Sequence, residues 1–196
     1  MRTVLRWFLG LLVRTVATLV LIVIVALAAG FAAFDWFYFQ SQRPQIAQLI
    51  AAAPQEERNP PDTLVRLLRA ASSRRIASWT YRVLYHDHAN PTGIRAYGVG
   101  AHHPELRALL WRACLWLHLS EQEQVTLIVS RSRFYLGRHM LGYAAASQAL
   151  FNRPLASLSN DEAATLVVGW HLGCFYGNSA FCAQRRDALL LALKEM

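Results

Sequence analysis

Residues 134–170, FYLGRHMLGYAAASQALFNRPLASLSNDEAATLVVGW, decide the fold of this chain. Ser159 is followed three residues later by Glu162, and this spacing predicts a capping box at the start of a helix. Apolar residues then recur at helical spacing to the end of the segment. Upstream we expect a second apolar helix over residues 138–151, which Pro154 prevents from continuing. The segment therefore predicts a tight helical hairpin.

Helices are also predicted on both sides of this hairpin. Apolar spacing predicts a helix over residues 62–71, another that opens at Pro104, and a last one over residues 179–194. A second capping box, Ser120 with Glu123, predicts a helix that runs to about Phe134. Residues 72–97 look irregular or short-helical, and we find no strand-like alternation of apolar and polar residues. The folded part is therefore expected to be mainly α.

The N-terminus carries an uncharged run, TVATLVLIVIVALAAGFAAF, at residues 15–34. As a helix this run crosses a hydrocarbon core of about 30 Å. Arginines precede it and aromatic residues follow it, so the positive-inside rule predicts a cytoplasmic N-terminus and a domain on the far side of the membrane. A cleaved signal peptide is the alternative, although such a peptide usually has a shorter apolar region. The predicted divisions are a cytoplasmic N-terminus (1–14), a transmembrane helix with an aromatic belt (15–39), a connector (40–61) and a domain (62–196).

The chain is basic, and its charge limits its partners. It has 196 residues and a formal net charge of +8, with 55% hydrophobic and 16% charged residues. A basic face outside the membrane suits anionic headgroups or a lipid linked through pyrophosphate. The predicted topology turns the domain away from nucleic acid. A merely solvated basic surface remains the alternative.

Several short pieces of the C-terminal half together carry a family resemblance. They are Tyr135-Leu136-Gly137, Gly142, Ala144-Ala145-Ala146, Leu150-Phe151-Asn152-Arg153, Leu158-Ser159, residues 162–169 and Gln184-Arg185-Arg186-Asp187. In order and spacing they resemble the C-terminal half of the peptidoglycan glycosyltransferase domain (glycosyltransferase family 51) of penicillin-binding proteins and monofunctional transglycosylases. The resemblance implies a small lysozyme-like α-helical domain, anchored in the inner membrane of a bacterium and facing the periplasm.

The catalytic half of that family pattern is largely missing. The resemblance implies a general-base glutamate in an E-D-x-x-F-x-x-H motif, a second glutamate near the donor pyrophosphate, and a divalent metal as cofactor. Tyr85 and His88 fit the end of the first motif, but its acidic pair falls on Tyr81-Arg82. Arg95 lies in a stretch that resembles the one after this motif. A base must reach the hydroxyl that it deprotonates, so loss of the carboxylates predicts loss of the reaction.

Three hypotheses follow from this pattern. The first is a degenerate domain that binds lipid-linked precursor, glycan strand or a protein of the cell-wall machinery. The second is an active transglycosylase in which Glu105 or Glu123, both out of pattern, replaces the lost base. The third is a membrane-anchored scaffold. The candidate binding residues are Tyr85, His88, Arg95, Tyr135, Gly137, Arg138 and Arg153.

Histidines and cysteines give weaker signals. The cluster His86-Asp87-His88 with His102-His103, and a looser set of His171 with Cys174 and Cys182, have zinc-ligand residue types but no defined spacing, and surface histidines are the alternative. No metal ligand is therefore assigned. Cys174 and Cys182 are close enough in sequence for a disulfide, and the third cysteine, Cys114, is expected to be a buried thiol.

Overall fold

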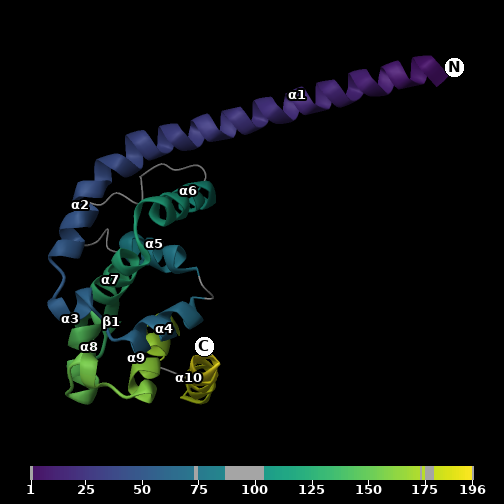
Figure 1. Cartoon of the computed structure of the whole chain (residues 1–196). Helices are drawn as coiled ribbons and strands as arrows, with labels where there is room; N and C mark the ends of the chain where they lie inside the picture. Colours follow the sequence, from purple (N-terminus) through teal and green to yellow (C-terminus); the bar gives the residue numbers. More distant parts are fainter. Residues whose placement is uncertain (1, 73–74, 87–103, 173, 175–178, 196) are drawn as a thin grey trace. The chain divides into compact units, whose positions relative to one another are not determined.

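The computed structural model describes residues 2–72, 75–86, 104–172, 174 and 179–195, which are mainly helical (Figure 1). The chain divides into two compact units, Met1–Ser41 and Gln42–Met196. The helices and strands are, in chain order, α1 (Arg2–Phe34), the π-helical turn η1 (Asp35–Phe39), α2 (Gln40–Ala51), α3 (Gln55–Arg58), α4 (Asp62–Ala71), α5 (Ile76–His86), α6 (Pro104–His118), α7 (Glu121–Arg131), β1 (Arg133–Tyr135), β2 (His139–Leu141), α8 (Tyr143–Phe151), the 3-10 turn η3 (Leu155–Ser157), α9 (Asn160–Leu172) and α10 (Ser179–Lys194).

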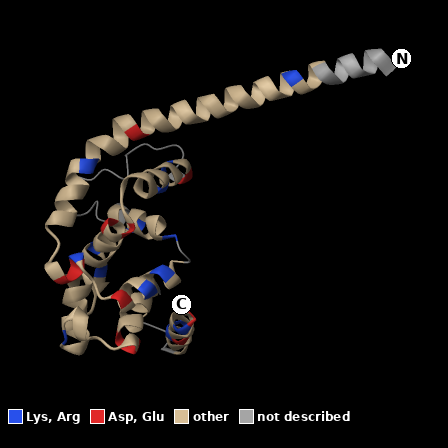
Figure 2. Cartoon of the chain, in the orientation of Figure 1, with Lys and Arg blue, Asp and Glu red and all other residues tan. Residues whose placement is uncertain are grey.

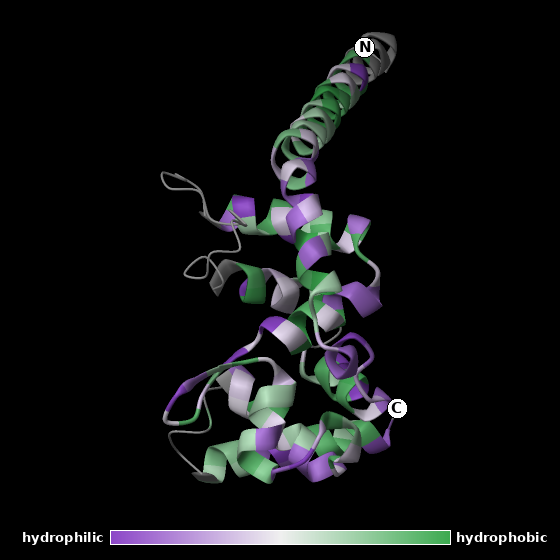
Figure 3. Ribbon diagram, turned by 90° about the vertical axis from the view of Figure 1, so that its left-hand side faces the viewer, coloured by the Kyte–Doolittle hydropathy of each residue, from purple (hydrophilic) through white to green (hydrophobic). Residues whose placement is uncertain are grey.

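The first unit is built around α1. Beyond its grey N-terminal part, Figure 2 shows this helix almost free of charged residues, and Figure 3 shows that apolar residues dominate it. Within the described residues, the helical stretch Leu11–Ala51 contains a segment long and apolar enough to cross a membrane. A single membrane span and a signal sequence both meet that criterion. Trp36, Phe37 and Tyr38, which follow the apolar run, are exposed as an aromatic belt would be.

The second unit has one main core, to which α4, α5, α7 and α9 contribute most. α4 packs against α9 and α10, while α5 packs against α6 and α7. α4 turns a strongly apolar face inward through Leu64, Leu67 and Leu68. α9 supplies four core residues from one helical face, and these are Ala163, Ala164, Leu166 and Val167. The helix boundaries predicted for residues 62–71 and 179–194 are confirmed.

Both predicted capping boxes are present. The Ser120 backbone N–H donates to Glu123 Oε2 at 2.7 Å, and the Glu123 N–H donates to Ser120 Oγ at 3.3 Å. The same reciprocal pair joins Ser159 and Glu162, at 2.8 and 3.2 Å. Each box satisfies backbone donors that a helix start leaves open. The local sequence therefore fixes where α7 and α9 begin.

The predicted helix over residues 138–151 is wrong in its first part. Residues 139–141 form β2, which pairs with β1 in an antiparallel hairpin, and α8 begins only at Tyr143. The predicted end of α7 near Phe134 is wrong for the same reason, because Phe134 lies in β1. Gly137 and Gly142 adopt positive φ angles of 74° and 88°, which a helix does not allow. Backbone turns at these two glycines therefore override the apolar spacing.

The predicted connector is also more ordered than a linker. Residues 42–61 belong to the second unit and are largely helical, as α2 and α3. Ile46, Ala53 and Glu57 are buried there. Arg58 helps to fix the segment, because its carbonyl oxygen accepts hydrogen bonds from Gln122 Nε2 at 2.6 Å and from Thr126 Oγ1 at 3.3 Å. The folded unit therefore begins about twenty residues before the predicted boundary at residue 62.

Candidate functional site

A groove of about 540 Å³ lies among the end of α4, the start of α5, the end of α6 and the start of α7. Its walls include polar and aromatic side chains, among them Arg69, Arg75, Trp116, Glu121 and Gln124. Pockets beside α9 and α10 are smaller, at about 330 and 220 Å³. The groove lies within the second unit and is the largest of these three pockets, and we take it as the candidate ligand site.

Charge in the groove is partly neutralised. Arg69 donates to Glu121 Oε1 from Nε at 2.8 Å and from Nη2 at 2.6 Å. Both side chains are about half exposed, so the pair contributes little to stability. Arg75 is exposed, and no ion pair within the described residues holds its guanidinium. The two arginines and one glutamate leave the groove with a net positive charge, which favours an anionic ligand.

Gln124 is a polar residue of the groove wall whose side chain is almost fully buried. Its side chain is 4% exposed, and its Nε2 donates to the carbonyl oxygens of Leu115 at 3.3 Å and Leu119 at 3.0 Å. These two bonds fix the orientation of the amide, because a carbonyl oxygen can only accept. Gln124 Oε1 is buried without a hydrogen-bond partner, which costs about 1–3 kcal/mol. Because this oxygen has no accessible surface, a ligand hydroxyl would reach it only if the wall of the groove opened.

Trp116 gives the groove an open aromatic surface. Its side chain is 74% exposed, although tryptophan is usually well buried. The indole offers a flat apolar face in the same groove as the positively charged Arg75. An apolar ring face and an anionic group are together the features of a charged or phosphorylated sugar.

Glu57 is the acidic residue that the sequence did not single out. Its carboxylate is 3% exposed, and its Oε1 accepts a hydrogen bond from the Ala144 backbone N–H at 2.9 Å. Burial raises the pKa of Glu57 to about 7, and the hydrogen bond from Ala144 and the charge of Arg131 oppose that rise. A carboxyl that titrates near neutral pH has the pKa of a general acid or base. It does not belong to the groove lining, however.

Glu57 caps the start of α8. Gly142, the residue before α8, has no side chain to cap this helix. Glu57 fills that role from α3, in a position where a Cβ on Gly142 would overlap Oε1. The helix dipole favours a negative group at this end. Contacts between α3 and α8 therefore depend on both residues.

The two candidate catalytic glutamates are not brought together. Glu105 lies exposed in the first turn of α6. Glu123 is occupied by the capping box, where Oε2 accepts hydrogen bonds from both N and Oγ of Ser120. Neither residue lines the groove. The sequence-based assignment of Glu123 as a base therefore competes with a structural role that the structure shows.

The candidate binding residues do not form one site. Tyr135, Gly137 and Arg138 lie on the β1–β2 hairpin, where the Leu136 N–H donates to the Arg138 carbonyl at 3.0 Å. Arg153 follows α8 and pairs with Glu162 at 3.5 Å. The remaining candidates are not placed: the side chain of Tyr85 lies outside the description, as do His88 and Arg95. None of the four placed residues lines the groove.

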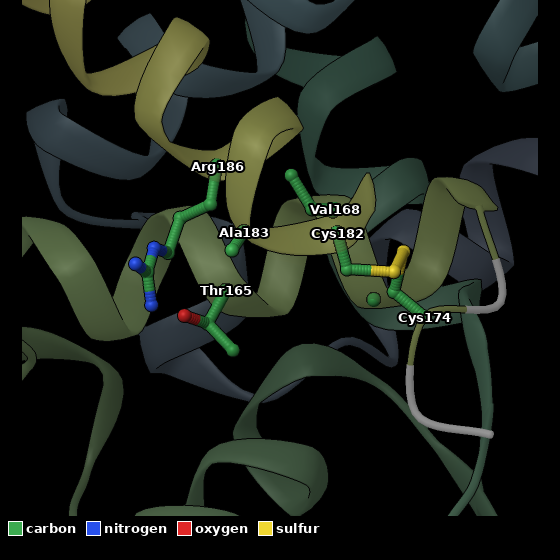
Figure 4. Close-up of a pocket in the computed structure, with 7 residues that line it drawn as sticks. Thr165, Val168, Cys174, Cys182, Ala183 and Arg186 are labelled. Carbon is green, nitrogen blue, oxygen red and sulfur yellow. A yellow bond between two sulfur atoms is a disulfide. The ribbon is translucent and has the colours of Figure 1, made fainter. Parts of the chain in front are cut away.

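The disulfide that the sequence left open is present. Cys174 and Cys182 form a disulfide, which excludes their use as thiolate ligands together with His171. Figure 4 shows this bond in the wall of the pocket of about 220 Å³ beside α9 and α10. Cys114 is buried and outside the disulfide, as predicted for a buried thiol. Among the described residues no group of three or more metal-ligating side chains occurs, and the cluster at residues 86–88 falls largely outside them.

His171 lies in an aromatic and basic environment instead. Its ring stacks on Trp79 with centroids 4.6 Å apart, and Arg82 Nη1 donates to its Nδ1 at 3.2 Å. Burial lowers the pKa of His171, and the charges of Arg82 and Arg185 lower it further. The imidazole is therefore a neutral hydrogen-bond acceptor toward Arg82 at neutral pH.

Comparison with protein-family models and with curated proteins returned no match to this chain.

Proposed function

We propose that this chain is a membrane-anchored binding protein of the peptidoglycan glycosyltransferase type, which holds a lipid-linked saccharide or glycan strand without polymerising it. The anchor is the apolar run in α1, with the N-terminus in the cytoplasm and the second unit on the far side of the bacterial inner membrane. The ligand is bound in the groove between α4, α5, α6 and α7. This proposal extends the sequence resemblance at residues 134–170 and 184–187.

The observation that carries the proposal is the chemistry of the groove. Trp116 presents an open ring face, Arg75 an exposed guanidinium and Gln124 a buried acceptor without a partner. Together the indole and the arginines suit a sugar attached to a phosphate or pyrophosphate: the ring packs on the indole, and the anion pairs with arginine.

Binding without turnover is favoured by the state of the carboxylates. Of the residues that line the groove in the described part, Glu121 is the one carboxylate, and Arg69 holds it at 2.6 Å. Glu123 is engaged in capping α7. Glu57 has a suitable pKa, but its carboxyl is almost fully buried and caps α8. A general base needs an open path to the hydroxyl that it activates.

The test is equilibrium binding of a fluorescent lipid-linked disaccharide-pentapeptide to the full-length protein in lipid nanodiscs. Saturable binding is expected, and it should weaken at least about tenfold in Arg75→Gln and in Trp116→Ala, which corresponds to about 1.4 kcal/mol for each variant. Both side chains are exposed, so the fold should survive. Arg138→Gln is the matched control, since Arg138 is an exposed arginine outside the groove.

The control variant also distinguishes a binding site in the groove from one on the β1–β2 hairpin. Loss of binding in Arg138→Gln, with Arg75→Gln unaffected, would move the site to the β1–β2 hairpin and reject the groove. No saturable binding by the unmodified protein would reject the binding function altogether and favour the membrane-anchored scaffold.

A further inference from the structure

A second pocket of the folded unit, lined by residues of α4, α9 and α10, has a composition that suits a ligand of its own. Its volume is about 330 Å³, and it shares no lining residue with the groove. Most of its wall consists of alanine, valine and leucine side chains. The polar exceptions are His171 on α9 and Arg185 on α10. The pocket is therefore an apolar space with a hydrogen-bonding side chain and a cationic one in its wall.

Arg185 carries a positive charge that no carboxylate neutralises in the described part of the chain. It is exposed, and its guanidinium lies 5.4 Å from the centre of the Phe181 ring. The next residue, Arg186, instead pairs with Asp161 at 3.2 Å and with Asp187 at 3.0 Å. A guanidinium binds a carboxylate through two parallel N–H donors. Arg185 is therefore available to an anion from outside the chain, whereas Arg186 is engaged.

His171 adds a hydrogen-bond donor to the same pocket. Its Nδ1 accepts from Arg82 Nη1 at 3.2 Å, so the proton of the neutral ring is on Nε2. No described residue accepts a hydrogen bond from this Nε2–H. Burial lowers the pKa of His171, and the two charges that lower it further, those of Arg82 and Arg185, are both positive. The environment of the ring therefore has positive charge to spare.

The rest of the wall fits a compact apolar body. It consists of four alanines, two valines and Leu189, and the short alanine side chains leave room for a ligand. Burying apolar surface contributes roughly 25 cal/mol per Å². One unpaired guanidinium beside a neutral imidazole matches a single negative charge better than the double charge of a phosphate. The lining therefore favours a carboxylate attached to a small hydrocarbon or aromatic group.

A covalent bond joins the segments that carry the two polar residues. Cys174 follows His171 by three residues, Cys182 precedes Arg185 by three, and these cysteines form the disulfide. The third wall, α4, packs against both α9 and α10. A site whose walls are held in place before the ligand arrives loses less conformational entropy on binding.

We propose that the pocket lined by α4, α9 and α10 binds a small organic carboxylate with a compact apolar body, which pairs with Arg185 and accepts a hydrogen bond from His171. This site is separate from the groove, and the inference does not depend on the proposed function. Its test therefore uses no saccharide.

The experiment titrates para-fluorobenzoate into the full-length protein in lipid nanodiscs and follows binding by fluorine NMR, with empty nanodiscs as the background. Saturable binding with a Kd of about 1 mM or lower is expected for a ligand of this size. para-Fluorobenzamide has the same ring without the charge, and trifluoroacetate has the charge without the ring. Each should bind at least about tenfold more weakly, because each lacks one of the two features that the lining recognises.

Two variants and two matched controls locate the site. Arg185→Gln removes the charge and Ala188→Trp fills the pocket, so each should weaken binding at least about fivefold. Both residues are exposed, so the fold should survive. Arg186→Gln removes the same charge from the neighbouring position, and Leu191→Trp adds an indole to α10 at a residue outside the lining. Both controls should bind within about twofold of the unmodified protein.

Several results would overturn the proposal. Equal weakening in Arg185→Gln and Arg186→Gln would show that binding follows net charge and not this pocket. Equal affinity for para-fluorobenzoate and para-fluorobenzamide would remove the anion from the site, and equal affinity for trifluoroacetate would remove the apolar body. Absence of saturable binding by the unmodified protein would reject the site.

Thermal melting checks that each variant is folded. Arg185→Lys keeps the positive charge and gives a second measurement at this position. It should bind within about threefold of the unmodified protein, because the lysine ammonium still pairs with a carboxylate. Loss of binding in a folded Arg185→Lys variant as large as in Arg185→Gln would contradict a charge contact that any cation at this position makes.

Discussion

Three helices of the second unit start with different kinds of cap. α7 and α9 are capped by a serine and a glutamate three residues apart in their own sequence. α8 begins after Gly142, which has no side chain, and it is capped by Glu57, which lies 87 residues before the Ala144 N–H that it binds. The first kind of cap is readable from sequence, whereas the second exists only once the chain has folded. Some helix starts in this unit are therefore set by the local sequence, and one is set by a contact between distant parts of the chain.

The largest loss of stability is expected from adding a side chain at Gly142, the residue before α8. Gly142→Ala should lower the free energy of unfolding by about 3–5 kcal/mol, because the new Cβ overlaps Glu57 Oε1 and the φ of 88° is strained for alanine. Chemical denaturation measures this loss.

Gly137→Ala is the matched control for this prediction. Its φ of 74° is similar, but nothing lies within 4 Å of the added Cβ, so strain alone should cost about 1 kcal/mol. Equal losses in the two variants would show that backbone strain, and not the contact with Glu57, governs α8.

The second prediction concerns the pH dependence that Glu57 confers. Its pKa is raised to about 7 in the folded protein from 4.5 in the unfolded chain, so the folded state binds the proton more tightly. Stability should therefore fall as pH rises from about 4.5 to about 7 and then level off, by up to about 3 kcal/mol. Urea denaturation across this pH range measures the slope.

Glu57→Gln removes the titration but keeps an oxygen that can accept from the Ala144 N–H. This variant should lose the fall in stability between these pH values and should be at least as stable as the unmodified protein at pH 8. Glu57→Ala leaves the N–H without this partner and should be less stable at every pH, by about 1–3 kcal/mol. An unchanged pH slope in Glu57→Gln would contradict the role of Glu57.

The smallest effects are expected at the local caps. Ser120→Ala and Ser159→Ala each remove one acceptor of a helix-start N–H and should cost about 1 kcal/mol. The expected order, Gly142→Ala above Glu57→Ala above either serine variant, is checked by denaturation under one set of conditions. A serine variant that loses as much stability as Gly142→Ala would contradict this order.

The parts of the fold that sequence predicts well are those with local signals. Capping serines, apolar spacing and an uncharged run locate α4, α7, α9, α10 and α1, and neighbouring cysteines suggest the disulfide. The hairpin at residues 133–141 escaped prediction, because its apolar residues suit a helix and only the positive φ angle of Gly137 reveals the turn. The ordered segment over residues 42–61 was missed because its burial depends on contacts with distant helices.

The candidate site was harder to predict, for a physical reason. The groove takes residues from four helices and a loop, and no short motif links Arg75, Trp116 and Gln124. Glu57 looked like one charge in a polar connector, because nothing near it in sequence indicates that α8 needs a cap there. Family motifs direct attention to Glu105 and Glu123, whereas the unpartnered oxygen of Gln124 appears only in three dimensions.

The central claim is recognition without polymerisation, and one measurement tests it most directly. Full-length protein in nanodiscs receives radiolabelled lipid-linked disaccharide-pentapeptide and a divalent metal, and the bound ligand and the glycan products are quantified in the same sample. We expect saturable binding that Arg75→Gln and Trp116→Ala weaken, with no product longer than the starting disaccharide. Glycan chains of several disaccharides, lost in the Glu105→Gln/Glu123→Gln double variant, would contradict it and establish an active transferase.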